Sequence, residues 1–122
     1  MASADEVRIL AGSGVCGAGF RAESLEEGMG KKPHFIGCDG GSTDPGPYPL
    51  GSGETSFGRS SIKRDMRLML LAARKAKIPL LLGTAGTSGG HPHVAIAKEI
   101  LMEIAAEENL KFPLAIIHAE QD

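Results

Sequence analysis

The chain has 122 residues, the size of a single domain, and 42% of them are hydrophobic, although only 4% are aromatic. A formal net charge of −2 argues against nucleic acid or an anionic membrane surface as the main partner. No apolar run approaches the roughly 18 residues of a membrane span, and residues 1–6 lack the features of a secretory signal. Two cysteines, Cys16 and Cys38, make no disulfide framework, so a cytoplasmic setting is expected.

The apolar pattern predicts strands and helices in alternation. Strands are predicted at 7–11, 34–38, 80–82 and 114–117, and helices at 22–29, from about 60 to 78, and from Pro92 onward. Continuous apolar strands joined through helices favour a parallel sheet covered on both faces. The predicted fold class is therefore α/β, a Rossmann-like three-layer fold of about four mostly parallel strands in one domain over 1–122. No helix follows the fourth strand, so the fold is expected to be incomplete at its C-terminus.

The two long helices carry opposite charges. Basic residues such as Lys63 and Arg67 mark the first, whereas Glu99, Glu103 and Glu107 form a row on the second. Crossovers that run in the same direction would place the helices side by side, where the two rows attract. Two separately solvated faces remain the alternative.

The strongest candidate for a ligand site is the loop that begins at Asp39, directly after the second predicted strand. Ligands bind open α/β sheets at the carboxyl ends of the strands. Prolines at 45, 47 and 49 stiffen the loop, and its glycines allow close approach. Its polar and glycine residues at the expected site are Gly41, Ser42, Thr43, Asp44 and Tyr48. The alternative to a ligand site is an ordinary turn followed by a surface loop that the prolines stiffen.

Two further glycine-rich loops are candidates for holding an anionic group. Residues 12–17 match G-x-G-x-x-G after the first strand, with Asp39 placed as a ribose-binding acid would be. However, a helix does not start readily at glycines 17 and 19, and a dinucleotide site needs a helix N-terminus here. The alternatives are a loop at Gly12, Ser13 and Gly14 that binds an anion through its backbone amides, and a purely structural tight turn.

The second glycine-rich loop, residues 83–90, leads into the helix that begins near Pro92. It offers backbone amides and the residues Thr84 and Gly86, and it lacks the lysine of a Walker A motif. His91 and His93 follow it and could act as a base or as metal ligands, or simply be surface histidines.

A third polar cluster, His118, Glu120 and Asp122, follows the last predicted strand. These three residues would lie at the carboxyl edge of the sheet together with Asp39, Asp44, His91 and His93. Such a set could bind a divalent metal or supply a general acid and base. The two cysteines should be neighbours at the ends of the first two strands, and partly buried thiols are favoured over a catalytic thiolate.

Several of these motifs resemble the acyclic terpene utilisation (AtuA-type) family. The resemblance is carried by residues 41–48 (GSTDPGPY), Lys63-Arg64-Asp65, residues 83–86 (GTAG) and the terminal Ala119-Glu120-Gln121-Asp122. It spans nearly the whole chain but only the N-terminal portion of such proteins, which are longer. It implies bacterial catabolism of compounds that are degraded as coenzyme A thioesters, and it argues against a dinucleotide site.

The function predicted from these observations is the ligand-binding part, or a subunit, of a catabolic hydratase or lyase acting on a carboxylate or acyl-CoA. A base is needed for a proton next to a carbonyl, and Asp39, Asp44 and His93 are the candidates. The substrate would be bound by Gly12, Ser13, Gly14, Gly41, Ser42, Thr43, Tyr48, Thr84, Gly86, His91 and Glu120. No cofactor is assigned, a divalent metal or a coenzyme A thioester being possible. A nucleotide-binding module and a non-catalytic assembly subunit, part of an oligomer or completed by a second chain, are the alternatives.

Overall fold

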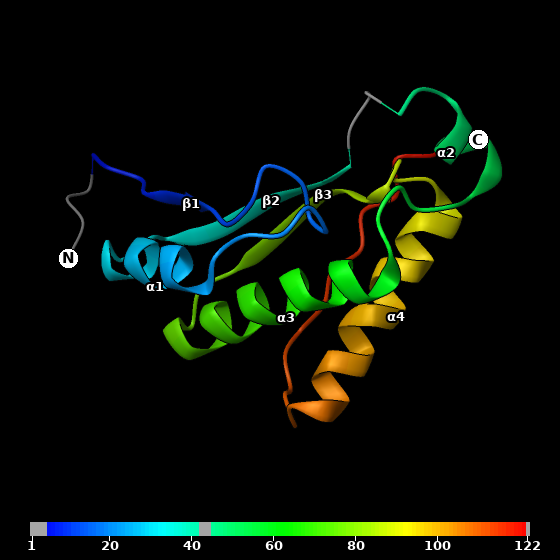
Figure 1. The fold of residues 1–122 in the computed structure, drawn as a ribbon. Helices are drawn as coiled ribbons and strands as arrows, with labels where there is room; N and C mark the ends of the chain where they lie inside the picture. Colours follow the sequence, from blue (N-terminus) through cyan, green and yellow to red (C-terminus); the bar gives the residue numbers. More distant parts are fainter. Residues whose placement is uncertain (1–4, 42–44, 122) are drawn as a thin grey trace.

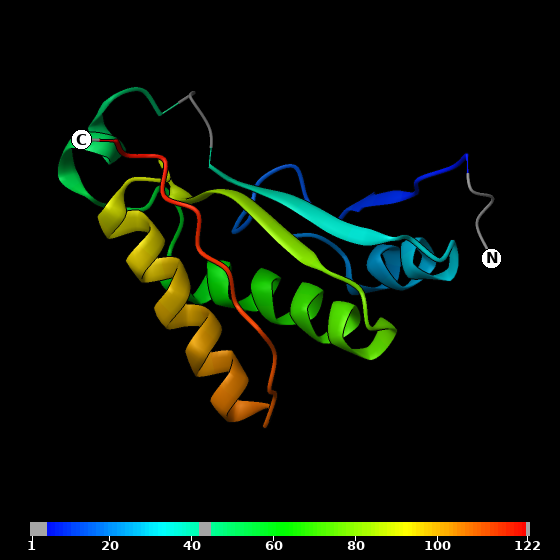
Figure 2. The same ribbon diagram turned by 180° about the vertical axis from the view of Figure 1, so that it is seen from behind.

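The chain folds into an open parallel sheet with helices packed on one face (Figures 1 and 2). The computed structural model describes residues 5–41 and 45–121. The elements in chain order are β1 (Ile9–Ala11), α1 (Ala22–Gly30), β2 (Phe35–Gly41), α2 (Tyr48–Ser52), α3 (Arg59–Ala76), β3 (Leu80–Thr87) and α4 (His91–Glu107). The three strands are parallel in the order β1-β2-β3. The predicted α/β class is confirmed, and the layout is consistent with a Rossmann-like fold.

Two glycines at the end of β2 allow β2 and β3 to approach closely beyond an irregularity in their pairing. The regular register runs from Ile36 opposite Leu80 to Asp39 opposite Gly83, and pairing resumes at Gly41 opposite Thr87. A Cβ on Gly41 would lie 1.7 Å from the carbonyl oxygen of Thr87. Side chains are thus excluded at this point for steric reasons, which explains part of the glycine-rich motif without a ligand.

The helices leave the opposite face of the sheet open, so the described residues form two layers where three were expected. Both strand-to-strand connections run in the same direction along the sheet, and right-handed crossovers then place α1 and α3 on the same face. Helix α4 packs against α3 and β3 (Figure 2). On the open face Ile9 is 62% exposed and Leu81 is 51% exposed.

The core lies between the sheet and α3 and α4, and it is aliphatic and rich in methionine. Ile36 of β2, Met66 and Met69 of α3, and Ile100 and Ile104 of α4 are fully buried. Their spacing on each helix is the predicted helical repeat. No helix in the described ranges combines the length and apolarity that crossing a membrane requires.

Ion pairs join the basic face of α3 to the acidic row of α4, as one of the two alternatives predicted. Lys63 Nζ lies 2.7 Å from Glu107 Oε1 and 3.0 Å from Glu103 Oε2. Arg59 and Arg67 extend the row in both directions, to Glu99, Glu103, Glu107 and Glu108. The charges therefore fix how two neighbouring helices face each other.

The predicted fourth strand, 114–117, is not a strand in the structure. This segment runs back beside α4 toward α2 (Figure 2), and no backbone hydrogen bond ties it to β3 in the part of the chain that the structure describes. Ile117 is 91% exposed. An apolar run shows a preference for burial, but a strand also needs a backbone partner in register, and residues 5–41 and 45–121 offer this segment none.

We expect Lys63→Gln to lower the melting temperature slightly at neutral pH and low salt. Hydrogen bonds from Lys63 hold the pKa of Glu103 and Glu107 below the usual range. A lowered carboxyl pKa contributes stability above the unfolded-state pKa, and this contribution is lost as the pH falls through the folded-state pKa. The difference between variant and wild type should therefore shrink in acid and in 1 M salt.

Calorimetric melting temperatures at several pH values and salt concentrations measure this difference. Lys75→Gln is the matched control, since Lys75 lies on the same helix and has no ion pair within residues 5–41 and 45–121. Equal melting temperatures for Lys63→Gln and wild type at low salt would contradict the stabilising role.

Candidate functional site

The carboxyl ends of β2 and β3 form the centre of the candidate site. Helix α2, the N-terminus of α4 and the C-terminal end of the tail (residues 118–121) gather at this edge (Figure 1). Three of the predicted site residues, Ser42, Thr43 and Asp44, lie outside the described residues, as does Asp122.

His93, in the first turn of α4, is a fully buried histidine with an unpaired ring nitrogen. Its Nε2 lies 2.8 Å from the carbonyl oxygen of Pro49 in α2. Because a carbonyl only accepts hydrogen bonds, Nε2 carries a proton, and in the neutral form of the ring Nδ1 then carries the lone pair. Nδ1 is buried and has no hydrogen-bond partner in the described part of the chain. Such an atom costs free energy in the folded state, and native proteins satisfy nearly all of them.

Glu120 faces the same point as the unpaired nitrogen. A Cβ placed on Gly90 would lie 3.1 Å from His93 Nδ1 and 3.1 Å from Glu120 Oε1. Glycine at position 90 therefore leaves room between an imidazole from α4 and a carboxylate from the tail. An imidazole and a carboxylate, which could serve as a base and an acid, thus border the same space at this edge.

Glu120 also satisfies the first amide of α4. Its Oε1 accepts the backbone N–H of His91 at 2.6 Å, and its Oε2 lies 3.3 Å from His91 Nδ1. The rings of His91 and His118 stack edge to face at 4.8 Å. A carboxylate thus occupies the position at the helix N-terminus where the dipole favours negative charge.

The predicted loop over 83–90 is in the structure the end of β3, up to Thr87, followed by a short turn, and its backbone adopts conformations that L-residues rarely adopt. Thr84 has φ +46° and Thr87 has φ +93°, in addition to Gly86 and Gly89. A Cβ on Gly86 would lie 2.4 Å from the carbonyl oxygen of His93. The loop is therefore packed tightly against the first turn of α4, and backbone strain of this kind occurs often at ligand sites.

Two predicted residues from the β2 loop make local contacts instead. Asp39 is exposed, and its Oδ1 accepts the N–H of Gly41 at 2.9 Å. The hydroxyl of exposed Tyr48 hydrogen-bonds to Glu54 at 3.1 Å, and the Glu54 carboxylate raises the pKa of Tyr48. Among the residues described, no three His, Cys, Asp or Glu side chains are grouped as metal ligands.

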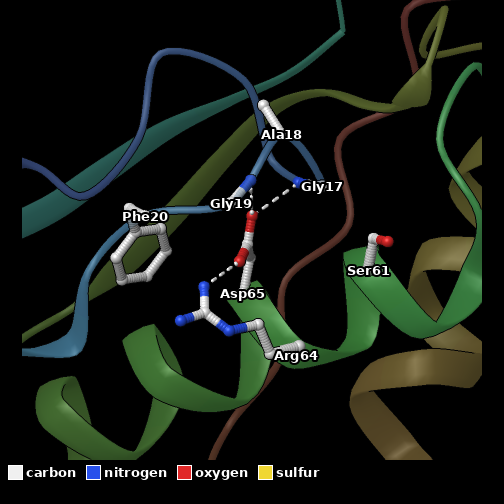
Figure 3. A pocket seen from close by; sticks show the side chains of 7 residues that line it. All are labelled: Gly17, Ala18, Gly19, Phe20, Ser61, Arg64 and Asp65. Atoms are coloured by element: carbon white, nitrogen blue, oxygen red, sulfur yellow. Dashed lines mark hydrogen bonds and ion pairs between the residues drawn. The ribbon is translucent and has the colours of Figure 1, made fainter.

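The first glycine loop surrounds a carboxylate of the chain itself (Figure 3). A pocket of about 330 Å³ here is lined by Gly17, Ala18, Gly19, Phe20, Ser61, Arg64 and Asp65. The fully buried Asp65 accepts the amides of Gly17 at 2.9 Å and Gly19 at 3.0 Å. Arg64 donates to its other oxygen at 2.8 Å and packs over the Phe20 ring.

Asp65 therefore occupies the two loop amides that a phosphate would need. The predicted start of this loop is also structural, since a Cβ on Gly12 would meet Met69 Sδ at 2.7 Å and Ser13 donates to the carbonyl of Val15. Asp65 was absent from the predicted site. Its position between Ile62 and Met69 on the apolar face of the helix was the available signal, because an acid on such a face must find partners.

No protein-family model, curated protein or solved structure matches the chain.

We expect Asp65→Ala to destabilise the fold by about 3 kcal/mol, because two amides lose a charged acceptor. Urea unfolding followed by circular dichroism measures this value. Ser61→Ala is the control, as Ser61 lines the same pocket but is exposed. If the two variants were equally stable, Asp65 would not hold the loop in place.

Proposed function

We propose that the chain is the ligand-binding part, or a subunit, of a catabolic hydratase or lyase that acts on a carboxylate or acyl-CoA substrate. The observation that carries this proposal is the buried Nδ1 of His93 at the carboxyl edge of the sheet, which has no hydrogen-bond partner among residues 5–41 and 45–121. The resemblance to the AtuA-type family supplies the substrate class. The residues at the carboxyl edge of β2 and β3 are the basis for the base and the oxyanion donors proposed below.

His93 is the proposed base. A neutral imidazole whose lone pair is not engaged can take a proton from water or from a carbon next to a carbonyl. The hydrogen bond to Pro49 fixes the ring and its tautomer. Glu120, which faces the same point, is a second group that can exchange a proton with the substrate. Asp39 and Asp44 remain alternative bases on the β2 side.

The backbone amides of residues 83–90 are the proposed donors to the substrate oxyanion. Proton abstraction next to a thioester or carboxylate places negative charge on the carbonyl oxygen, and oriented amides stabilise it. This segment, the end of β3 and the turn after it, leads into the N-terminus of α4 and is packed against His93. The Gly89 amide is not among the proposed donors, because it donates to the carbonyl of Ala85. The first glycine loop is assigned no such role, because Asp65 accepts its amides at Gly17 and Gly19.

We expect His93→Gln to lower the hydration rate of a short-chain enoyl-CoA at least about 100-fold with little change in KM. Glutamine can still donate to the Pro49 carbonyl but offers no basic nitrogen. The measurement is the loss of enoyl-thioester absorbance, after native mass spectrometry has identified which thioesters or free carboxylates the wild type binds.

His34→Gln is the control for that experiment, since His34 lies at the opposite end of the sheet from His93. Full activity of His93→Gln would reject His93 as the base. A wild-type chain that bound no carboxylate or thioester would reject the proposed substrate class.

The open face of the sheet favours a second candidate function, a non-catalytic assembly subunit. Val7, Ile9 and Leu81 are exposed apolar side chains, and Ile9 and Leu81 lie on the two outer strands, on either side of β2. Exposed apolar patches of this kind are typical of surfaces that bind another chain.

If this face associates, Leu81→Asp should reduce the molar mass measured by light scattering to that of one chain. Met102→Asp is the matched control, because Met102 is equally exposed but lies on α4. A wild-type mass equal to one chain would argue against self-association through this face.

A further inference from the structure

Cys16 and Cys38 lie together beneath the carboxyl edge of the sheet. Cys16 belongs to the first glycine loop and is 2% exposed, and Cys38 belongs to β2 and is 7% exposed. Both are free thiols. The backbone N–H of Cys16 donates to the carbonyl of Asp39 at 2.7 Å, which ties the loop to the residue next to Cys38. The sequence prediction that the two are neighbours is confirmed.

The two sulfur atoms interact and are not equivalent. The neighbouring Cys16 thiol lowers the pKa of Cys38, and Cys38 in turn raises the pKa of Cys16. The Cys38 thiol donates to the carbonyl oxygens of Ser13 at 3.6 Å and Asp39 at 3.3 Å. Cys16 Sγ also lies 3.9 Å from the carbonyl of Ile62 in α3. Cys38 is thus the sulfur that ionises first, and Cys16 is held next to it as a second thiol.

We propose that Cys16 and Cys38 form an intramolecular disulfide when the chain meets a peroxide. The proposal stands on the placement of the two thiols and does not depend on the substrate of the carboxyl edge. Peroxide is the appropriate oxidant because it is small, which suits sulfurs this deeply buried.

The steps balance with hydrogen peroxide as the oxidant. The Cys38 thiolate attacks one peroxide oxygen, the O–O bond breaks, and the released hydroxide takes up the thiol's proton to leave as water. Cys38 is then a sulfenic acid. Cys16 attacks its sulfur, the S–S bond forms, the S–OH bond breaks, and the hydroxide leaves as a second water with the proton from Cys16. Two thiols are oxidised to one disulfide and one peroxide is reduced to two waters.

The first glycine loop, which carries Cys16, is held in place. This favours attack of Cys16 on the Cys38 sulfenic acid over further oxidation of Cys38. Asp65 anchors the loop at Gly17 and Gly19, directly after Cys16, so Cys16 cannot move far from Cys38. A resolving thiol held this close traps a sulfenic acid before a second peroxide reacts. The disulfide would bind the glycine loop covalently to β2 beside Asp39, at the edge where the candidate site lies.

The test uses the wild-type chain treated with hydrogen peroxide, then unfolded and alkylated. The expected result is an intact mass reduced by two hydrogen atoms, no alkylated cysteine, a cross-linked peptide pair containing Cys16 and Cys38, and full alkylation after dithiothreitol. Cys16→Ser should then give a sulfenic acid at Cys38 that reacts with dimedone.

Two outcomes would overturn the proposal. One is a wild-type chain in which both thiols are still alkylated after peroxide treatment. The other is oxidation without the cross-link, seen as added oxygen atoms on one cysteine or as a disulfide between two chains. Both can be recognised in the wild type alone, so the test holds even if a serine variant folds poorly.

Discussion

The arrangement of the β1 side of the molecule depends on the hydrogen bonds that the buried carboxylate of Asp65 accepts. Removing a charge from water costs several kcal/mol, and only excellent partners offset that cost. Two amides of the glycine loop and the half-exposed Arg64 provide them. The loop after β1 is consequently fastened to α3, and Cys16 within it is held against the end of β2. A sequence that resembles a phosphate-binding motif here binds an anion that the chain supplies itself.

His93 presents the opposite situation on the β3 side of the same edge. Both groups are fully buried near the start of long helices, but Asp65 has partners for both oxygens whereas Nδ1 of His93 has none among the described residues. A satisfied buried group stabilises a fold, while an unsatisfied one is a cost that function can justify. This contrast is why the carboxyl edge of β2 and β3, and not the first glycine loop, is the site to which we assign chemistry.

Because the helices pack on one face of the sheet, the other face is left as a surface that a partner chain could bind. Helices α3 and α4 are joined by a row of ion pairs on their outer surface and by methionine and isoleucine beneath it. The reverse face of the sheet keeps Ile9 and Leu81 in solvent. One face is therefore closed by both charge and apolar contacts, and the other presents apolar surface near the amino ends of the strands.

Local patterns in the sequence determined α1, α3 and α4, the three paired strands, the facing charge rows of α3 and α4 and the proximity of Cys16 to Cys38, but not α2, which lies in a segment predicted as a loop. Each follows from short-range spacing and from the known geometry of parallel strands. Only the tertiary structure decided that 114–117 forms no strand, that Asp65 occupies the glycine loop and that His93 keeps an unpaired nitrogen. These features depend on which distant groups meet: a strand requires a partner, and a buried polar atom is satisfied or left unsatisfied by residues far away in the chain.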